Sequence, residues 1–360
     1  MFLLDSHCDT PSQIHRLRDL SLDNDHAHVD FPKLRRGTVD GAFFALYIPA
    51  ALDSDSSAAW AYAEALYDGV MQTLEKNPET AALATSFTQA KENRENGKFS
   101  VFLGLENASP IGKDISRLAE LHARGVRYIT LCHSGNNEVC DSCAPKQKRW
   151  GGLSPFGVQV LEEMNRLGIL IDVSHVSDDT FYDVIRYSKK PIVATHSCCR
   201  ALCDHPRNMT DDMIRTLAAT GGVIQINFFP VFLDASFSET LKASGISERG
   251  EAIEAEFIKD PSDPQKRAAW NAVQDELTAL RRPSYKLIAD HIDHVVSLVG
   301  VEHVGLGSDF DGIDVTPEGM EDCSCYPMLL EELRRRGYSE EDIEKIAGGN
   351  LFRVMEAQLD

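Results

Sequence analysis

The chain places histidine and carboxylate side chains at the ends of several short apolar runs. These side chains are His7, Asp9, Glu106, His133, His175, His196 and Asp309. His7 and Asp9 are two residues apart, so within a strand they project from the same face. Imidazole and carboxylate ligands together suit zinc, manganese or a related divalent ion. The pattern therefore predicts a site for divalent metal.

Three of the histidines, one aspartate and one glutamate exceed the needs of a single tetrahedral site, and they suffice for two ions that share one carboxylate. Many binuclear barrel hydrolases use a carboxylated lysine as this bridge, but no lysine ends the apolar runs at 100–108 and 126–133. Glu106 can place one oxygen on each ion instead. Such a bridge would hold the ions about 3.5–4 Å apart with a hydroxide between them.

The elements that must position these side chains are eight short runs rich in β-branched and aromatic residues. Helical patterns lie between them, for example at 56–76, 113–124, 154–167, 177–187 and 285–299. We expect strands at 2–9, 41–49, 100–108, 126–133, 168–175, 191–197, 221–228 and 303–310. Strands alternating with helices in this way predict an α/β fold, a (β/α)8 TIM barrel, whose active site lies at the carboxyl ends of the strands.

One charged segment, 234–283, interrupts the alternation between strands seven and eight. We expect helices at 251–258 and 265–280 and interpret the segment as a helical insertion on the barrel rim. Its few apolar residues predict that it has no core of its own. We therefore expect a single domain over residues 1–360.

The composition excludes several classes of partner. With 36 Lys and Arg against 56 Asp and Glu, the 360-residue chain has a formal charge of −20. An acidic protein repels nucleic acid and anionic membranes. No apolar run approaches the ~20 residues of a membrane-spanning helix, and neither a leader peptide nor a hydrophobic tail is recognisable. We expect a cytoplasmic protein whose nine cysteines are mostly reduced.

Taken together, the motifs resemble the membrane (renal) dipeptidase family, peptidase family M19, among the amidohydrolase-type metal barrels. The matching stretches follow the family's order across nearly the whole chain. They are DSHCDT at 5–10, GLEN at 104–107, TLCH at 130–133, IDVSHVS at 171–177, ATHS at 194–197, HPRN at 205–208, GLGSDFDG at 305–312 and GGNLFRV at 348–354. Without a leader or an anchor tail, the chain is similar to the bacterial, cytoplasmic branch of that family.

This resemblance implies a role for each site residue. A first zinc ion would be bound by His7, Asp9 and Glu106, and a second by Glu106, His175 and His196. A water or hydroxide would bridge the two ions together with Glu106.

The remaining roles concern the substrate. The resemblance implies that His133 contacts the substrate near the scissile bond, that Arg207 binds its terminal carboxylate and that Asp309 transfers the proton. The implied activity is dipeptide hydrolysis, including L-D dipeptides, by a homodimer. The alternative is another amidohydrolase-type reaction, such as deamination or hydrolysis of a lactone or β-lactam. Substrate preference is the least transferable part, because segment 234–283 borders the loop after strand seven.

Overall fold

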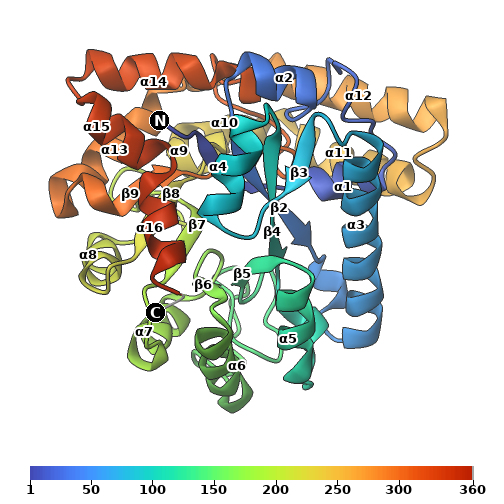
Figure 1. Cartoon of the computed structure of the whole chain (residues 1–360). Coiled ribbons are helices and arrows are strands. Elements are labelled where there is room, and N and C mark those ends of the chain that lie inside the picture. Colours follow the sequence, from blue (N-terminus) through green and yellow to red (C-terminus); the bar gives the residue numbers. More distant parts are fainter. Residues whose placement is uncertain (359–360) are drawn as a thin grey trace.

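A computed structural model describes residues 1–358 of the chain. Its centre is a nearly closed barrel of parallel strands in the order β1-β2-β4-β5-β6-β7-β8-β9 (Figure 1). The strands are β1 Leu4–Cys8, β2 Gly41–Tyr47, β4 Phe99–Glu106, β5 Val126–Thr130, β6 Leu170–Asp172, β7 Val193–Ser197, β8 Val223–Ile226 and β9 Val304–Leu306. Each coincides with one of the eight expected runs, so the predicted (β/α)8 fold is confirmed.

Helices surround the barrel. They are α1 Thr10–His15, α2 Phe31–Arg36, α3 Ser56–Lys76, α4 Phe87–Glu95, α5 Ser116–Ala123, α6 Pro155–Leu167, α7 Asp178–Tyr187, α8 Asp211–Ala219, α9 Pro230–Leu233, α10 Ala235–Ser244, α11 Ile246–Lys259, α12 Pro264–Thr278, α13 Lys286–Val299, α14 Tyr326–Arg335, α15 Glu340–Glu344 and α16 Asn350–Glu356. Two of these helices begin with a side-chain cap: the Ser177 side chain accepts from Thr180 N at the start of α7, and the Thr210 side chain accepts from Met213 N at the start of α8. These bonds satisfy amide groups that a helix leaves without partners.

Two strand features differ from the sequence expectation. A three-residue strand, β3 Ala81–Leu83, pairs with the first three residues of β4. Strand β5 ends three residues early, before His133, and strands β6 and β9 end three and four residues early, before His175 and Asp309. His175 and Asp309 have positive φ, 69° and 64°, a conformation that extended strands exclude.

Apolar side chains fill the amino-terminal half of the barrel interior. Seven strands each contribute one residue: Leu4, Phe43, Phe102, Tyr128, Leu170, Val193 and Val223. Leu351, Phe352 and Met355 of α16 pack on this layer, so the last helix covers that end of the barrel. The polar and charged side chains of the predicted site therefore lie at the carboxyl ends of the strands.

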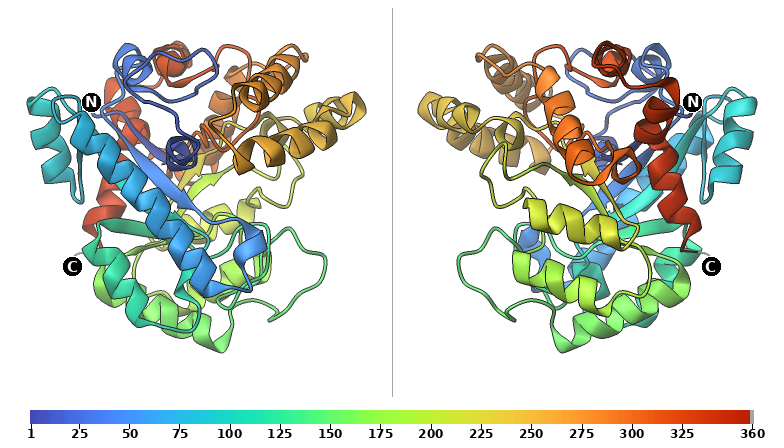
Figure 2. Two further views of the ribbon diagram at one scale, coloured as in Figure 1. Left: turned by 90° about the vertical axis from the view of Figure 1, so that its right-hand side faces the viewer. Right: turned by 90° about the vertical axis from the view of Figure 1, so that its left-hand side faces the viewer.

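Segment 234–283 folds into α10, α11 and α12, which project to one side of the barrel (Figure 2). The expectation that it lacks a core was wrong. Six of its residues, Phe237, Ile246, Phe257, Trp270, Val273 and Leu277, form a buried cluster with Val315. The spacing of these residues along three helices places them on facing sides, so a few apolar residues suffice.

The extent of the domain stays a prediction, and Leu359 and Asp360 lie outside the described residues. Among residues 1–358, none of the helices combines the length and the apolar character that crossing a membrane requires.

Candidate metal centre and active site

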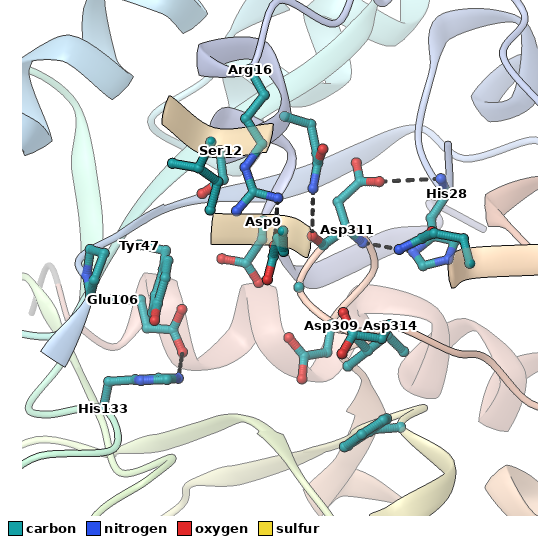
Figure 3. Close-up of a pocket in the computed structure, with 18 of the residues that line it drawn as sticks. Asp9, Ser12, Arg16, His28, Tyr47, Glu106, His133, Asp309, Asp311 and Asp314 are labelled. Carbon is teal, nitrogen blue, oxygen red and sulfur yellow. Dashed lines mark hydrogen bonds and ion pairs between the residues drawn. The ribbon is translucent and has the colours of Figure 1, made fainter. Parts of the chain in front are cut away.

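A cavity of about 700 Å³ opens at the carboxyl ends of the barrel strands. Five of the predicted site residues line it, namely Asp9, Glu106, His133, His175 and Asp309. Figure 3 shows Glu106 and His133 on one side of it and Asp309 with Asp311 on the other. Six strands or the turns after them therefore bring the predicted residues together.

The first group of donor atoms surrounds His7, which is fully buried on β1. Its Nε2 lies 3.4 Å from Asp9 Oδ2 and 3.5 Å from Glu106 Oε2. The other ring nitrogen, Nδ1, is 2.8 Å from the Tyr128 hydroxyl. Gly104 makes room for this contact, because a Cβ there would lie 2.2 Å from the Tyr128 ring. The Tyr128 ring thus holds His7 with Nε2 directed toward the two carboxylates.

The second group surrounds the other oxygen of the same glutamate. Glu106 Oε1 lies 3.1 Å from His175 Nε2 and 3.4 Å from His196 Nε2. The two imidazole nitrogens are 2.9 Å apart. Each oxygen of Glu106 therefore faces a different set of nitrogen donors.

The spacing of these donors fits divalent metal. Zinc bonds of about 2.0–2.1 Å in a tetrahedron separate neighbouring ligand atoms by about 3.3–3.4 Å, close to the distances around Glu106. His7 Nε2 and Asp9 Oδ1 are also buried and have no hydrogen-bond partner among the described residues. Buried polar atoms without partners are costly, and coordination would satisfy them.

The electrostatics of the metal-free site agree with this fit. Burial, together with the neighbouring Glu106, raises the pKa of Asp9 to about 6. Burial lowers the pKa of His175 and of His196 well below the usual histidine value. The pKa of His7 shifts the other way: burial lowers it, but the neighbouring Glu106 and Asp9 raise it well above the usual histidine value. The site therefore combines two neutral imidazoles, His175 and His196, with crowded carboxylates that a cation would stabilise.

Asp309 follows β9 and lies beside the first group. The Asn227 side chain donates from Nδ2 to Asp309 Oδ2 over 2.8 Å, while Oδ1 is 3.9 Å from His7 Nε2. Burial raises the pKa of Asp309 above its usual value. Asp309 Oδ2 is thus held in place by Asn227, and Oδ1 is directed toward His7.

His133 lies across the cavity from Asp309. Its Nε2 is 4.0 Å from Glu106 Oε1, and its Nδ1 is 3.1 Å from Ser134 Oγ. Burial and the Arg207 charge lower the pKa of His133 to about 4. A neutral imidazole therefore faces the same carboxylate as the second group of donors.

Arg207 is buried beneath the cavity wall. Its Nη2 donates to the His196 carbonyl over 3.0 Å, and the guanidinium lies 5.4 Å from the centroid of Phe232, a wall residue. Nε and Nη1 are buried without a hydrogen-bond partner in residues 1–358. Two nitrogens of the guanidinium therefore lack a hydrogen-bond acceptor within the described residues, although Arg207 is not one of the residues that line the cavity.

Comparison with known proteins assigns the chain to a family. A sequence model described as membrane dipeptidase, peptidase family M19, matches residues 1–359. The chain belongs to the membrane dipeptidase family. It is accordingly a metallo-dipeptidase, a hydrolase that uses metal.

Curated relatives and solved structures agree with this assignment. Dipeptidase verJ of Clonostachys rogersoniana is 31% identical over 340 residues, which span 92% of this chain and 76% of that protein. Dipeptidase aclJ of Aspergillus oryzae is 31% identical over 350 residues, 96% of this chain and 73% of that protein. The probable dipeptidase PvdM from Pseudomonas aeruginosa superposes with a TM-score of 0.80 at 29% identity, covering 99% of this chain and 95% of that one. Since these two curated relatives are fungal, the expected bacterial branch stays a prediction.

The structure also places residues in the dipeptidase cavity that sequence reasoning missed. Tyr47 ends β2 and pairs in register with Glu106, so its position at a strand end was an available signal. Asn227, which supports Asp309 without lining the cavity, falls within the expected strand 221–228, and nothing in its spacing indicated the bond to Asp309. Trp270 and Glu254 come from the insertion, whose fold the sequence did not predict in enough detail.

Asp311 stabilises the turn after β9 that carries Asp309. Its carboxylate accepts from Arg18 Nη1 over 2.6 Å and from Thr10 Oγ1 over 2.9 Å. Its backbone N donates to His28 Nδ1 over 2.9 Å. These bonds hold the loop after α1 against the turn that carries Asp309.

Proposed function

We propose that the protein is a binuclear zinc dipeptidase that hydrolyses L-L and L-D dipeptides. The observation that carries the proposal is the placement of Glu106, whose Oε2 faces His7 and whose Oε1 faces His175 and His196. His7, Asp9 and Glu106 would bind one zinc ion, and Glu106, His175 and His196 the other. Bound zinc would polarise the peptide carbonyl and lower the pKa of a water molecule between the ions.

Asp309 acts as the general base and then the general acid. Its Oδ2 is occupied by Asn227, so Oδ1, on the side of His7, accepts the proton of the attacking water. The same oxygen then delivers that proton to the leaving amine.

His133 and Arg207 bind the substrate. The neutral imidazole of His133 donates a hydrogen bond to the oxyanion that forms at the scissile carbon. The guanidinium of Arg207, whose Nε and Nη1 have no partner among the described residues, would bind the terminal carboxylate through charged hydrogen bonds. Recognition of a free carboxylate next to the scissile bond selects the last peptide bond of a chain, which in a dipeptide is the only one.

The experiment is a panel of substrates supplied to the zinc-loaded protein. We expect hydrolysis of L-L and L-D dipeptides and slow or no hydrolysis of the matching dipeptide amides, which lack the carboxylate. Arg207→Lys should raise KM for the free dipeptides about 10–100-fold, since charged hydrogen bonds contribute about 1.5–3 kcal/mol, and should leave the amides unaffected. Failure to hydrolyse any dipeptide with two zinc ions bound contradicts the proposal. A homodimer and a cytoplasmic location stay predictions of the sequence.

A further inference from the structure

A buried carboxylate connects three of the strands that carry the site histidines. Asp172 is the last residue of β6 and is fully buried. Its Oδ2 accepts from the hydroxyls of Thr130 and Thr195 over 2.5 and 2.6 Å. Its Oδ1 accepts from the backbone N of Ser174 and of Thr195 over 3.0 and 2.9 Å. Asp172 thus joins the ends of β5, β6 and β7, the strands that lead to His133, His175 and His196.

The Thr195 hydroxyl links this carboxylate to one of the imidazoles. A hydroxyl has a single proton, and that of Thr195 is donated to Asp172 Oδ2. The same Oγ1 lies 2.8 Å from His196 Nδ1. Thr195 must therefore accept on that side, so His196 carries its proton on Nδ1.

The consequence appears at the opposite nitrogen of the ring. With the proton on Nδ1, His196 Nε2 carries a lone pair. This Nε2 lies 3.4 Å from Glu106 Oε1 and 2.9 Å from His175 Nε2. A neutral imidazole with a free lone pair is the form that binds metal.

We propose that Asp172 and Thr195 are positioning residues for the second metal ion, acting through a hydrogen-bonded chain from carboxylate to hydroxyl to His196 Nδ1. The proposal rests on the binuclear site proposed above. In metal centres generally, the partner of the second ring nitrogen fixes the tautomer and the orientation of a histidine ligand, and loss of that partner lowers metal affinity about 10–100-fold.

Two threonines of the chain provide a matched pair of variants. Thr130 and Thr195 are both fully buried and donate to the same oxygen of Asp172, but only Thr195 contacts His196. Thr195→Val should raise the dissociation constant of the second zinc ion, the one that His196 would bind, about 10–100-fold in a chelator competition. Thr130→Val and Thr195→Ser should bind zinc like the wild type. Equal weakening in both valine variants, or no weakening in Thr195→Val, overturns the proposal.

A second measurement needs neither zinc nor substrate. In ¹⁵N-labelled, metal-free wild type, the imidazole shifts of His196 should report a proton on Nδ1, and in Thr195→Val this preference should be lost. A proton on Nε2 in the wild type overturns the proposal. A wild type that binds two zinc ions but hydrolyses no dipeptide contradicts the proposed function alone, because the tautomer is measured independently of hydrolysis.

Discussion

Four non-glycine residues with positive φ lie at the metal-binding end of the barrel: Asn107, His175, Asp309 and Asp311, with φ of 79°, 69°, 64° and 67°. Such backbone costs about 1–3 kcal/mol per residue and persists where surrounding contacts enforce it. Here it turns each chain segment sharply after a strand, so that His175 and Asp309 face the centre. His175 and Asp309, two of the predicted site residues, thus also bear local backbone strain.

The substitution Asp309→Asn tests the role of this single residue in proton transfer. The amide keeps the size of the side chain but cannot accept the proton of water, so kcat should fall about 10²–10⁴-fold while two zinc ions remain bound. Zinc content by elemental analysis serves as the control for the kinetic measurement. Wild-type turnover in a variant that retains zinc would contradict the role.

Asp9 gives a pH-dependent prediction for the metal-free protein. Its folded pKa of about 6 lies above the usual aspartate value, so the folded state holds a proton that the unfolded state has released. The stability from this protonation is present below pH ~4 and is lost as pH rises through about 6. In the presence of chelator, the wild type should lose stability relative to Asp9→Asn across this range. The shifted pKa would be contradicted if, in urea denaturation, the free energy of unfolding of the wild type minus that of Asp9→Asn stayed constant or increased as pH rises through this range.

At the scale of elements, sequence predicted the eight barrel strands and most of the helices between them, because buried parallel strands are nearly continuous apolar runs. It also named the residues that surround Glu106, because strand ends converge in a barrel. The sequence could not predict the contacts between these residues, because they join distant positions. The hydrogen bond from Asn227 to Asp309, for example, joins residues 82 positions apart. The core of the insertion escaped prediction for the same reason, since its residues meet only after three helices have packed.

Trp270 tests whether the insertion has its own core. Trp270→Ala removes a large buried side chain from the cluster of α10–α12, and such losses cost about 3–5 kcal/mol in well-packed sites. Hydrogen exchange should accelerate in 234–283 and stay slow in the barrel strands, and KM should rise because Trp270 lines the cavity. Ile258→Ala is the control for hydrogen exchange alone, since Ile258 is 44% exposed and lies outside the buried cluster but, like Trp270, lines the cavity. Faster exchange throughout the barrel would show that the insertion is not a separate cluster.

At the scale of the whole molecule, the proposed function requires a chain with a charge of −20 to bind an anionic substrate terminus in a cavity whose wall includes Asp9, Glu106 and Asp309. Two divalent cations and Arg207 would reverse the local field there. Metal should therefore stabilise the fold as well as enable activity. A ligand at 100 times its dissociation constant adds about 2.7 kcal/mol to the free energy of unfolding, so chelation should lower Tm in calorimetry. An unchanged Tm after complete zinc removal would contradict this coupling.

The central claim, that Glu106 bridges two zinc ions which together support dipeptide hydrolysis, is tested most directly by titrating the metal-free protein with zinc. Bound zinc is counted by elemental analysis while hydrolysis of an L-L and an L-D dipeptide is followed. We predict that activity reaches its maximum at two bound zinc ions per chain, and that Glu106→Gln binds zinc more weakly and loses most activity. Full activity with a single ion, or two bound ions without hydrolysis of either dipeptide, would contradict the claim.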